Sequence, residues 1–443
     1  MKLLRLLVSI ALWFGTPVAA ATVVKGNLER RAQLGFQMAQ EKEQLRITET
    51  IVGSPAERAG LRSGDILLAV NGRNFTQPHE GIALLQRLRG GREAALSLTR
   101  GGQPASVRFV PVAEPLEDEE AVDTEYGVVR TRDGAVLRTI LTRPSATNRR
   151  LPALLLTQWV SCNSLEAKGP SVDQLKGLAT RAGMLLVRVE RSGAGDSLGP
   201  ACHELDYDTE VEHYRQAFDQ LVKHPWVDPN KVVIYGNSLG GTTAPLVAQG
   251  RTLAGIMVQG GGAVSYFERM MGFDRLYLER GVKAPPGEVD RRMRRTAAFQ
   301  VEYLLRGKSP EQIARERPEL AGTWSQIRGT GEGVHYGRPL AWHQQAAQKN
   351  FLEAWSNLTV PVLVVYGQFD QFETRHGHKL IVDTLNGLRP GSATFIEIAN
   401  ADHELDIYAN AEDAYAYRNG VAAPELFLQP AVSWLKNVIG SSK

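Results

Sequence analysis

From about residue 125 onward, short apolar runs alternate along the chain with longer stretches that have helical spacing. The clearest runs span residues 153–157, 231–235, 253–258, 360–366 and 394–398. Such runs are typical of parallel strands whose two faces are both covered by helices. The pattern predicts an α/β fold with a doubly wound, mostly parallel sheet over about residues 124–443.

Residues 30–113 have a different pattern, with short strands and one longer helix. Asn71-Gly72 forms a tight turn between apolar runs, residues 79–88 are amphipathic, and residues 107–112 form a closing strand. The acidic segment 114–123 follows and is too polar to pack. We therefore expect a small β-rich domain and a larger α/β domain with independent cores, joined by a solvated linker.

A serine lies at a sharp turn between a strand and a helix. The sequence Gly236-Asn237-Ser238-Leu239-Gly240 follows the run 231–235 and precedes helical residues 241–249. Glycines on both sides tolerate the crowded backbone of such a turn, and the helix N-terminus favours a developing oxyanion. The pattern predicts Ser238 as a catalytic nucleophile.

A serine nucleophile needs a general base and a carboxylate that orients this base. Asp370 follows the run 360–366 and His403 follows the run 394–398, so both lie on the sheet edge that carries Ser238. Glu373 is the alternative carboxylate. His376 and His378 lie on a predicted helix after Asp370, where we expect an exposed helix face.

These pieces resemble the α/β-hydrolase superfamily, nearest to its secreted serine esterases and peptidases. Residues 187–197 also resemble the strand and glycine-rich turn that precede the nucleophile strand in that family. The resemblance covers about residue 125 to the C-terminus. It implies a triad of Ser238, His403 and Asp370, an acyl-enzyme that water hydrolyses, and no cofactor.

The expected oxyanion hole departs from the pattern of this family. Members often have His-Gly after the third strand, where this chain has Gln158-Trp159. The alignment makes Leu239 N–H the first donor and Val160 N–H the second, or Trp159 N–H if the register shifts by one. Trp159 as a core aromatic only is the alternative.

In the family, an insertion such as residues 264–355 caps the active site. Residues 288–305 and 310–326 within it have helical spacing. A basic cluster on this cap is either a solvated helix face or a site that attracts anionic substrates; it comprises Arg291, Arg292, Arg294 and Arg295.

The N-terminal unit resembles a PDZ domain over about residues 33–112, most specifically in residues 51–72. In that family, the loop that corresponds to Leu34, Gly35 and Phe36 holds the terminal carboxylate of a peptide on backbone N–H groups. The peptide then adds as a strand to the sheet edge. A PDZ fold used only as an intramolecular brace is the alternative.

The first 21 residues predict a secretory signal peptide. A basic start at residues 1–5 precedes an apolar stretch at 6–14 and small residues up to Ala20 and Ala21. A retained anchor is the alternative. We expect a periplasmic or secreted protein with no membrane span after cleavage, since no run of about eighteen apolar residues occurs. A net charge of +3 indicates no nucleic-acid partner.

The chain has two cysteines, Cys162 after the third hydrolase strand and Cys202 after the glycine-rich turn. In the family the strands that feed these loops are neighbours. The resemblance and the expected export together imply a Cys162–Cys202 disulfide. Two cysteines are too few for a thiolate metal site, and no histidine spacing indicates zinc.

The preferred hypothesis is an exported serine hydrolase that cleaves carboxylic esters, with a small-molecule or peptide acyl substrate. The alternative is a serine peptidase or amidase that uses the PDZ domain to hold peptide C-termini. A third hypothesis is an inactive hydrolase fold that serves as a peptide-binding scaffold.

Overall fold

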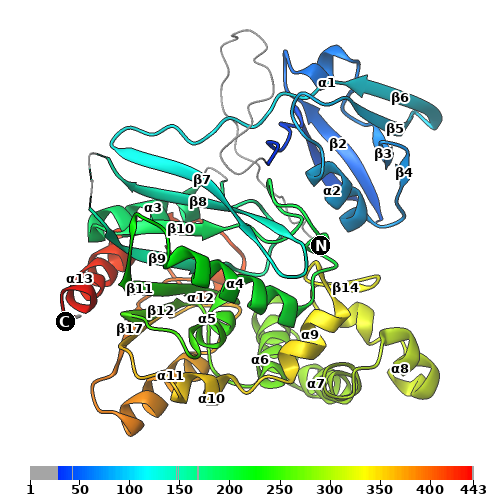
Figure 1. Ribbon diagram of the computed structural model, residues 1–443. Coiled ribbons are helices and arrows are strands. Elements are labelled where there is room, and N and C mark those ends of the chain that lie inside the picture. The colour runs from blue at the N-terminus through cyan, green and yellow to red at the C-terminus, as the bar shows by residue number, and fades with distance from the viewer. Residues whose placement is uncertain (1–27, 42, 146, 148, 167–168, 442–443) are drawn as a thin grey trace.

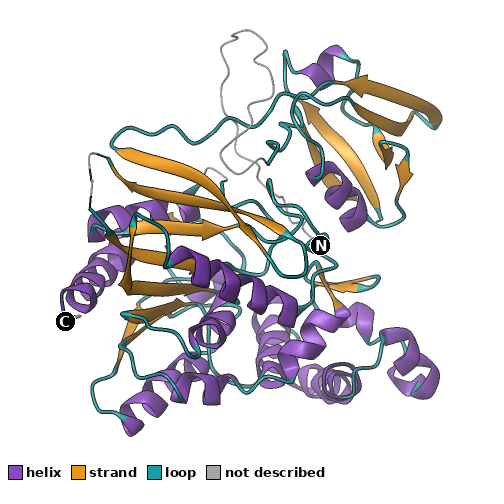
Figure 2. Cartoon of the chain, in the orientation of Figure 1, coloured by secondary structure: helices purple, strands orange, loops and turns teal. Residues whose placement is uncertain are grey.

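The computed structural model describes residues 28–441 apart from residues 42, 146, 148, 167 and 168. Two β-sheet units follow one another along this part of the chain (Figure 1 and Figure 2). The proposed signal peptide lies outside the described residues, so it stays a prediction.

The first unit is a small antiparallel sheet with two helices. Its sheet order is β1-β2-β3-β5-β6, and β4 pairs with β3. The elements are β1 (Phe36–Glu41), β2 (Gln44–Thr50), α1 (Pro55–Arg58), β3 (Ile66–Val70), β4 (Arg73–Asn74), α2 (Pro78–Gln86), β5 (Ala94–Arg100) and β6 (Gln103–Phe109). The closing strand ends earlier than expected, before Pro111, because proline has no N–H to donate to a ladder.

The second unit contains an eight-stranded sheet in the order β17-β16-β12-β11-β9-β10-β8-β7. Its strands are β7 (Val122–Arg130), β8 (Val136–Pro144), β9 (Leu151–Thr157), β10 (Leu185–Val189), β11 (Val227–Asn237), β12 (Gly255–Gln259), β16 (Val362–Gly367) and β17 (Ala393–Ile398). Strands β7 and β8 are antiparallel, and β8 is antiparallel to β10. The six strands from β10 to β17 are mutually parallel, which confirms the predicted fold.

Helices cover both faces of this sheet. One face packs against α4 (Tyr207–Leu221), α5 (Gly240–Ala248) and α11 (Arg375–Leu388). The other face packs against α3 (Pro170–Ala182) and α13 (Glu425–Ser441). Strand residues alternate between the two apolar clusters, so the central strands are buried on both sides, as their continuous apolar runs require.

The cap between β12 and β16 is mainly helical. It contains α6 (Tyr266–Leu276), η1 (Tyr277–Gly281), α7 (Pro286–Gln300), η2 (Val301–Leu305), α8 (Pro310–Glu316), η3 (Pro318–Leu320), η4 (Trp324–Gln326), β13 (Thr330–Gly331), β14 (Val334–His335), β15 (Arg338–Pro339), α9 (Leu340–Ala347) and α10 (Phe351–Ser356). Residues 310–326, which have helical spacing in the sequence, form the short helical segments α8, η3 and η4 rather than one continuous helix. Pro318 lacks the N–H that a continuous helix needs, and Gly322 has a φ of +75°. After β17 follow β18 (Asp406–Ile407), α12 (Ala411–Tyr415) and β19 (Val421–Ala422).

Most of the acidic segment between the two units is exposed, as expected, but Glu117 within it is packed. The Glu117 side chain is only 8% exposed and accepts two hydrogen bonds from Arg188, at 2.6 and 2.7 Å. Arg188 lies on β10 with a fully buried side chain, and a buried guanidinium needs a counter-charge. The segment therefore supplies a structural anion to the hydrolase sheet.

A second polar junction joins the start of the first unit to the hydrolase unit. Arg30 is 2% exposed, and its guanidinium pairs with Asp196 and, at 2.7 Å, with Glu166. Arg31 also pairs with Glu166, and its N–H donates to Asp196 at 2.8 Å. The two units have separate apolar cores, as expected, but buried charges tie them together.

Both ends of the small unit meet at this junction. Ala32 and Ala113 form an antiparallel bridge. On either side of that bridge, Gln33 N–H donates to the Val112 carbonyl and Glu114 N–H donates to the Arg31 carbonyl, each at 2.8 Å. The chain thus enters and leaves the small unit side by side.

Helix α2 of the small unit faces the hydrolase unit (Figure 1). The ring of His79 contacts the ring of His203 edge-on at 5.2 Å between centroids. Gln77 Nε2 donates to Glu332 of the cap at 2.6 Å. The small unit therefore contacts both the cap and the loop that carries Cys202.

Candidate active site

Ser238 occupies a strained turn between β11 and α5. Its φ is +52°, in the left-handed region that non-glycine residues rarely adopt. A Cβ added to Gly240 would lie 1.9 Å from the Thr157 carbonyl oxygen, and one on Gly236 would lie 2.8 Å from the Gly240 oxygen. Both glycines are therefore required by close backbone approach, as the sequence pattern predicted.

The structure brings the three predicted triad residues together. Asp370 follows β16 and His403 follows β17, two parallel strands on the same side of β11. Asp370 Oδ2 accepts a hydrogen bond from His403 Nδ1–H at 2.7 Å, and His403 Nε2 lies 2.8 Å from Ser238 Oγ. This is the geometry in which an imidazole can take the hydroxyl proton.

Backbone groups fix the orientation of Asp370. Its Oδ1 accepts the N–H groups of Phe372 and Glu373, each at 2.8 Å, so Oδ2 is left to His403. Burial opposes the charge of Asp370, but the His403 interactions outweigh burial and lower the pKa of this carboxyl. Burial also opposes the charge of His403, yet Asp370 and Glu373 raise the pKa of its imidazole above the ordinary value of 6.5.

Glu373, the alternative carboxylate, has another partner. It forms an ion pair with Arg269 of α6 in the cap, and His403 Nδ1 bonds to Asp370 instead. Burial raises the pKa of Glu373 to about 7, although Arg269 acts in the opposite direction. The geometry thus favours Asp370 as the orienting carboxylate.

The expectation for His378 is wrong. His376 is exposed on α11, as expected, but His378 is fully buried and its Nδ1–H donates to the Thr374 carbonyl at 2.9 Å. Burial lowers the pKa of His378 to about 4. The first turn of α11 packs under the Asp370 loop, so its inner face is not solvent-exposed.

The candidate oxyanion residues surround the nucleophile turn. Leu239 is the N-cap of α5, and Thr157, directly before the loop with Trp159 and Val160, donates its hydroxyl to the Gly240 carbonyl at 2.9 Å. Within the described residues, the N–H groups of Leu239, Trp159 and Val160 have no hydrogen-bond partner. Three unpaired donors therefore lie close to the turn.

The side chains of Gln158 and Trp159 bond to other residues of this loop. Gln158, at the position of the family's histidine, is buried and donates through Nε2 to the Asn163 carbonyl at 2.9 Å. The Trp159 indole is partly buried against the core and donates to Ser161 Oγ at 2.7 Å. The Trp159 indole therefore packs partly against the core, and its backbone N–H is left unpaired.

Sequence reasoning missed two residues beside His403. Gln259, at the end of β12, donates through Nε2 to the His403 carbonyl at 2.8 Å and accepts from Tyr235 at 2.9 Å. A Cβ on Gly260 would lie 2.7 Å from His403 Cε1. The run of three glycines after β12 was the available signal for this close approach.

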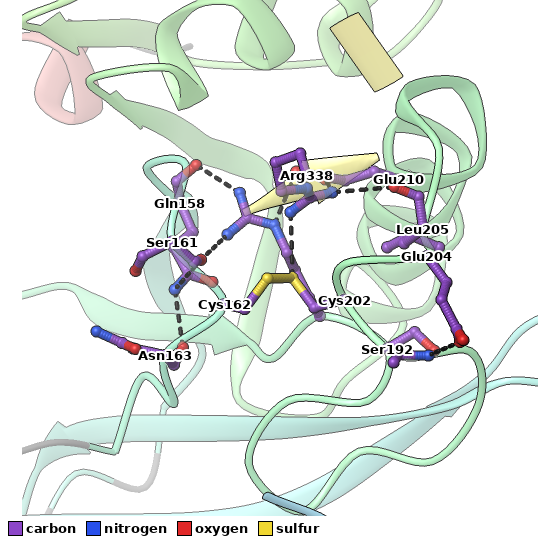
Figure 3. The surroundings of a disulfide bond; sticks show 12 residues. Gln158, Ser161, Cys162, Asn163, Ser192, Cys202, Glu204, Leu205, Glu210 and Arg338 are labelled. Atoms are coloured by element: carbon purple, nitrogen blue, oxygen red, sulfur yellow. Dashed lines mark hydrogen bonds and ion pairs between the residues drawn. A yellow bond between two sulfur atoms is a disulfide. The ribbon is translucent and has the colours of Figure 1, made fainter. Parts of the chain in front are cut away.

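The disulfide between Cys162 and Cys202 is present, as predicted (Figure 3). It joins the loop after β9 to the loop after β10, and these two strands are parallel neighbours. The crosslink therefore lies one loop away from the nucleophile turn.

A cavity of about 220 Å³ lies between the cap and the Asp370 loop, beside the triad. Its lining consists of Val264, Glu268, Arg269, Phe372, Glu373, Thr374 and His376. The Phe372 ring also contacts the His403 ring at 4.8 Å between centroids. The cap thus adds charged side chains next to the site.

The basic cluster on α7 does not reach this cavity. Arg291 pairs with Glu288 and Arg294 pairs with Asp290 on the exposed helix face, and Arg295 donates to Thr323 at 2.8 Å. These local partners favour the solvated helix face over an anion site. Among the described residues, no group of three or more His, Cys, Asp or Glu side chains is arranged to hold a metal ion.

The expected peptide-carboxylate loop lies at the start of β1. Gly35 has a φ of +74°, and its carbonyl accepts from Ser54 Oγ at 3.0 Å and from Ile51 N–H at 2.9 Å. Leu34 packs partly against the small core and Phe36 is buried in it. The strand that follows, β1, is an edge of the sheet.

Fold and site together define an α/β hydrolase with an appended PDZ domain. The family model described as alpha/beta hydrolase family matches residues 159–416, and the chain belongs to this family. A PDZ domain model matches residues 46–100.

Two curated relatives match shorter stretches. A "Probable CtpA-like serine protease" of Staphylococcus saprophyticus is 37% identical over 71 residues, which are 16% of this chain and 14% of that protein. The polyketide transferase ATR5 of Stachybotrys chlorohalonatus is 36% identical over 120 residues, 27% of this chain and 36% of that protein. The chain thus covers only a minor part of either relative.

The structural comparison also matches an esterase of Pyrococcus furiosus, at 10% identity and a TM-score of 0.44, covering 73% of this chain and 96% of that chain. An esterase of Pyrobaculum calidifontis matches at 18% identity and a TM-score of 0.39, covering 74% and 86%. None of the helices within the described residues is long and apolar enough to cross a membrane.

Proposed function

We propose that this protein is an exported serine hydrolase that cleaves carboxylic esters through Ser238, His403 and Asp370. The observation that carries the proposal is the continuous hydrogen-bonded row from Asp370 Oδ2 through His403 to Ser238 Oγ, at 2.7 and 2.8 Å. The serine is held at this point by the strained turn between β11 and α5.

The geometry supports acyl transfer in two steps. His403 Nε2 takes the Ser238 proton as Oγ attacks the acyl carbonyl, and the imidazolium then gives that proton to the leaving alkoxide. Asp370 holds the imidazole tautomer in which Nδ1 carries the proton. Water, activated by His403 in the same way, releases the acid from Ser238. Leu239 N–H and a backbone N–H of the loop after β9 would stabilise the oxyanion.

Esters are the preferred substrate class because an alkoxide leaving group demands less of the acid step than an amine does. Peptidase or amidase activity is the second candidate. The observation that favours it is the PDZ domain, whose edge strand β1 is open to strand addition and whose helix α2 contacts the hydrolase unit through His79.

A fluorophosphonate probe and a substrate panel test these functions. The wild-type protein should label at Ser238 and hydrolyse short acyl esters faster than aminoacyl amides, while Ser238→Ala should do neither. Faster cleavage of amides would replace the ester proposal with the peptidase one. Failure of the folded wild-type protein to label would favour the inactive scaffold.

Export to the periplasm or the medium is part of the proposal. It rests on the N-terminal sequence pattern and on the disulfide, since disulfides persist in oxidising compartments. N-terminal sequencing of the protein from cell fractions tests it. A mature protein in an exported fraction that begins near Ala21 or Thr22 is the expected result.

A further inference from the structure

Arg269 is a cap residue that the proposed chemistry does not use, and it lines the cavity beside the triad. It lies on α6 with a side chain that is 12% exposed. Phe372 lines the same cavity, and its ring contacts the His403 ring at 4.8 Å between centroids. A group that binds next to Arg269 in this cavity would therefore lie close to the His403 imidazole.

The positive charge of Arg269 is incompletely matched by its surroundings. Its Nη2 forms an ion pair with Glu373, whereas its Nη1 is buried and has no hydrogen-bond partner among the described residues. Burial raises the pKa of Glu373 to about 7, so this carboxyl is only partly ionised near neutral pH. Because a buried guanidinium needs a counter-charge and acceptors for its N–H groups, the site has capacity for a further anion.

Arg328 of the cap adds a second positive charge next to Phe372. Its guanidinium lies over the rings of Phe372 and Phe273, at 5.0 and 5.2 Å from their centroids. Burial raises the pKa of the nearby Asp274 carboxyl to about 7, although Arg328 acts in the opposite direction. The acids that face these two arginines thus carry less than a full negative charge near neutral pH.

The other acid in the lining of the cavity is engaged in its own helix. Glu268 is exposed, and its Oε2 accepts the Ser265 N–H at 3.0 Å and the Ser265 hydroxyl at 2.6 Å, which caps α6. An entering group therefore meets a buried charge that is positive, beside a carboxylate already bonded at the helix end.

We propose that Arg269 binds a carboxylate of the substrate, so that the enzyme prefers esters that carry a free acid group. This substrate class rests on the proposed function. A guanidinium is suited to the role because its planar fork of N–H groups matches a carboxylate. The substrate carboxylate would accept from the unpaired Nη1–H and would compete with Glu373 for the rest of the guanidinium.

Matched pairs of esters test this preference. On the acyl side, the 4-nitrophenyl monoester of adipic acid is compared with methyl 4-nitrophenyl adipate. On the alcohol side, 4-carboxyphenyl hexanoate is compared with 4-(methoxycarbonyl)phenyl hexanoate, and each rate is divided by that of the same ester with hydroxide. In one of the pairs, kcat/KM of the acid should exceed that of its neutral partner by about 10- to 100-fold, as expected for hydrogen bonds to a charged group. A ratio near one in both pairs would overturn the proposal.

Substitutions of Arg269 and Glu373 assign the preference to the guanidinium. Arg269→Met should bring the ratio of acid to neutral ester close to one. Arg269→Lys keeps the charge but loses the fork, so it should leave an intermediate ratio. Glu373→Gln should raise the ratio, because it removes the anion that competes for Arg269. Any effect of these changes on His403 acts on both esters of a pair and cancels in the ratio.

Arg275→Met is the matched control. Arg275 lies further along α6, where it forms an exposed ion pair with Glu279 at 3.0 Å, and its substitution should leave the ratio unchanged. If Arg269→Met lowers stability or both rates equally and the ratio keeps its wild-type value, Arg269 only joins the cap to the Asp370 loop and the proposal fails. If Arg269→Met does not fold, Arg269→Lys decides by the same ratio. Failure of the proposed function is distinct, because the wild-type protein would then neither label at Ser238 nor turn over any of these esters.

Discussion

Removing the Arg30 guanidinium should destabilise the hydrolase domain, although Arg30 precedes the PDZ domain in the chain. The Arg30→Met substitution keeps the length of the side chain and deletes its charge. It leaves Glu166 and Asp196 buried with fewer partners, and it also frees the carbonyls of Glu114 and Pro115, which Arg30 binds at 3.0 Å.

The expected loss follows from what remains at the junction. Breaking a buried ion pair costs about 3–5 kcal/mol when the other charge is left alone. Glu166 keeps Arg31 and Tyr126, and Asp196 keeps Arg138, so the lower end applies. About 3 kcal/mol is a change of roughly 150-fold in the unfolding equilibrium. With a urea m-value of about 3 kcal/mol/M, the midpoint should fall by roughly 1 M.

Tryptophan emission reports on unfolding of the hydrolase domain in this assay. In residues 22–443 every tryptophan lies in the hydrolase unit, at positions 159, 226, 324, 342, 355 and 434. Arg46→Met, which breaks an exposed pair with Glu41, is the control and should change the free energy of unfolding by about 1 kcal/mol or less. Equal small effects from both substitutions would refute the structural role given to Arg30.

Three further predictions concern the site and the disulfide. Ser238→Ala and His403→Ala should abolish turnover without unfolding the protein, and Asp370→Asn should lower kcat by about 10⁴-fold, as measured by steady-state kinetics. The acid limb of kcat/KM should have its midpoint above 6.5, because the base must be neutral and the pKa of His403 is raised. Glu373→Gln should move this midpoint to lower pH, because it removes an anion that raises the pKa of His403 and leaves Arg269 and the neutral His378 in place. An unmoved midpoint would contradict the assignment of the acid limb to His403. Mass mapping of protein from its export compartment should find Cys162 linked to Cys202, and free thiols in most molecules would count against export.

Residue order and local pattern were enough to predict which edge of the sheet carries the candidate triad. In a parallel α/β sheet, residues that directly follow strands meet at one edge, so Ser238, Asp370 and His403 could be placed together from their runs alone. The disulfide was implied by the family resemblance and the expected export, since the two cysteine loops follow neighbouring strands in that fold, as β9 and β10 are here. These predictions depend only on the order of the strands and on which residues follow them, and local sequence patterns indicate both.

Predictions that depended on side-chain partners failed or stayed open. Glu117 was expected to be solvated with the rest of the acidic linker. Its partner Arg188 lies 71 residues away, so this pairing leaves no local trace in the sequence. His378 was expected on an exposed face, but its helix packs on the Asp370 loop and buries it. The spacing of apolar residues around one position does not reveal such a contact.

Because residues 31–33 pair with residues 112–114, the PDZ domain is arranged as an insertion into the hydrolase unit rather than as a separate domain joined in tandem. The two ends of the domain meet at the antiparallel bridge between Ala32 and Ala113. The ion pair of Arg30 with Glu166 lies outside this bridge, with the hydrolase unit. Domains with adjacent termini tolerate such excision well. Replacing residues 33–112 by Asn-Gly, a favoured two-residue hairpin turn, would keep Arg30 and Arg31 in place. The resulting minimal hydrolase should fold, whereas a truncation that starts the chain at residue 113 should not.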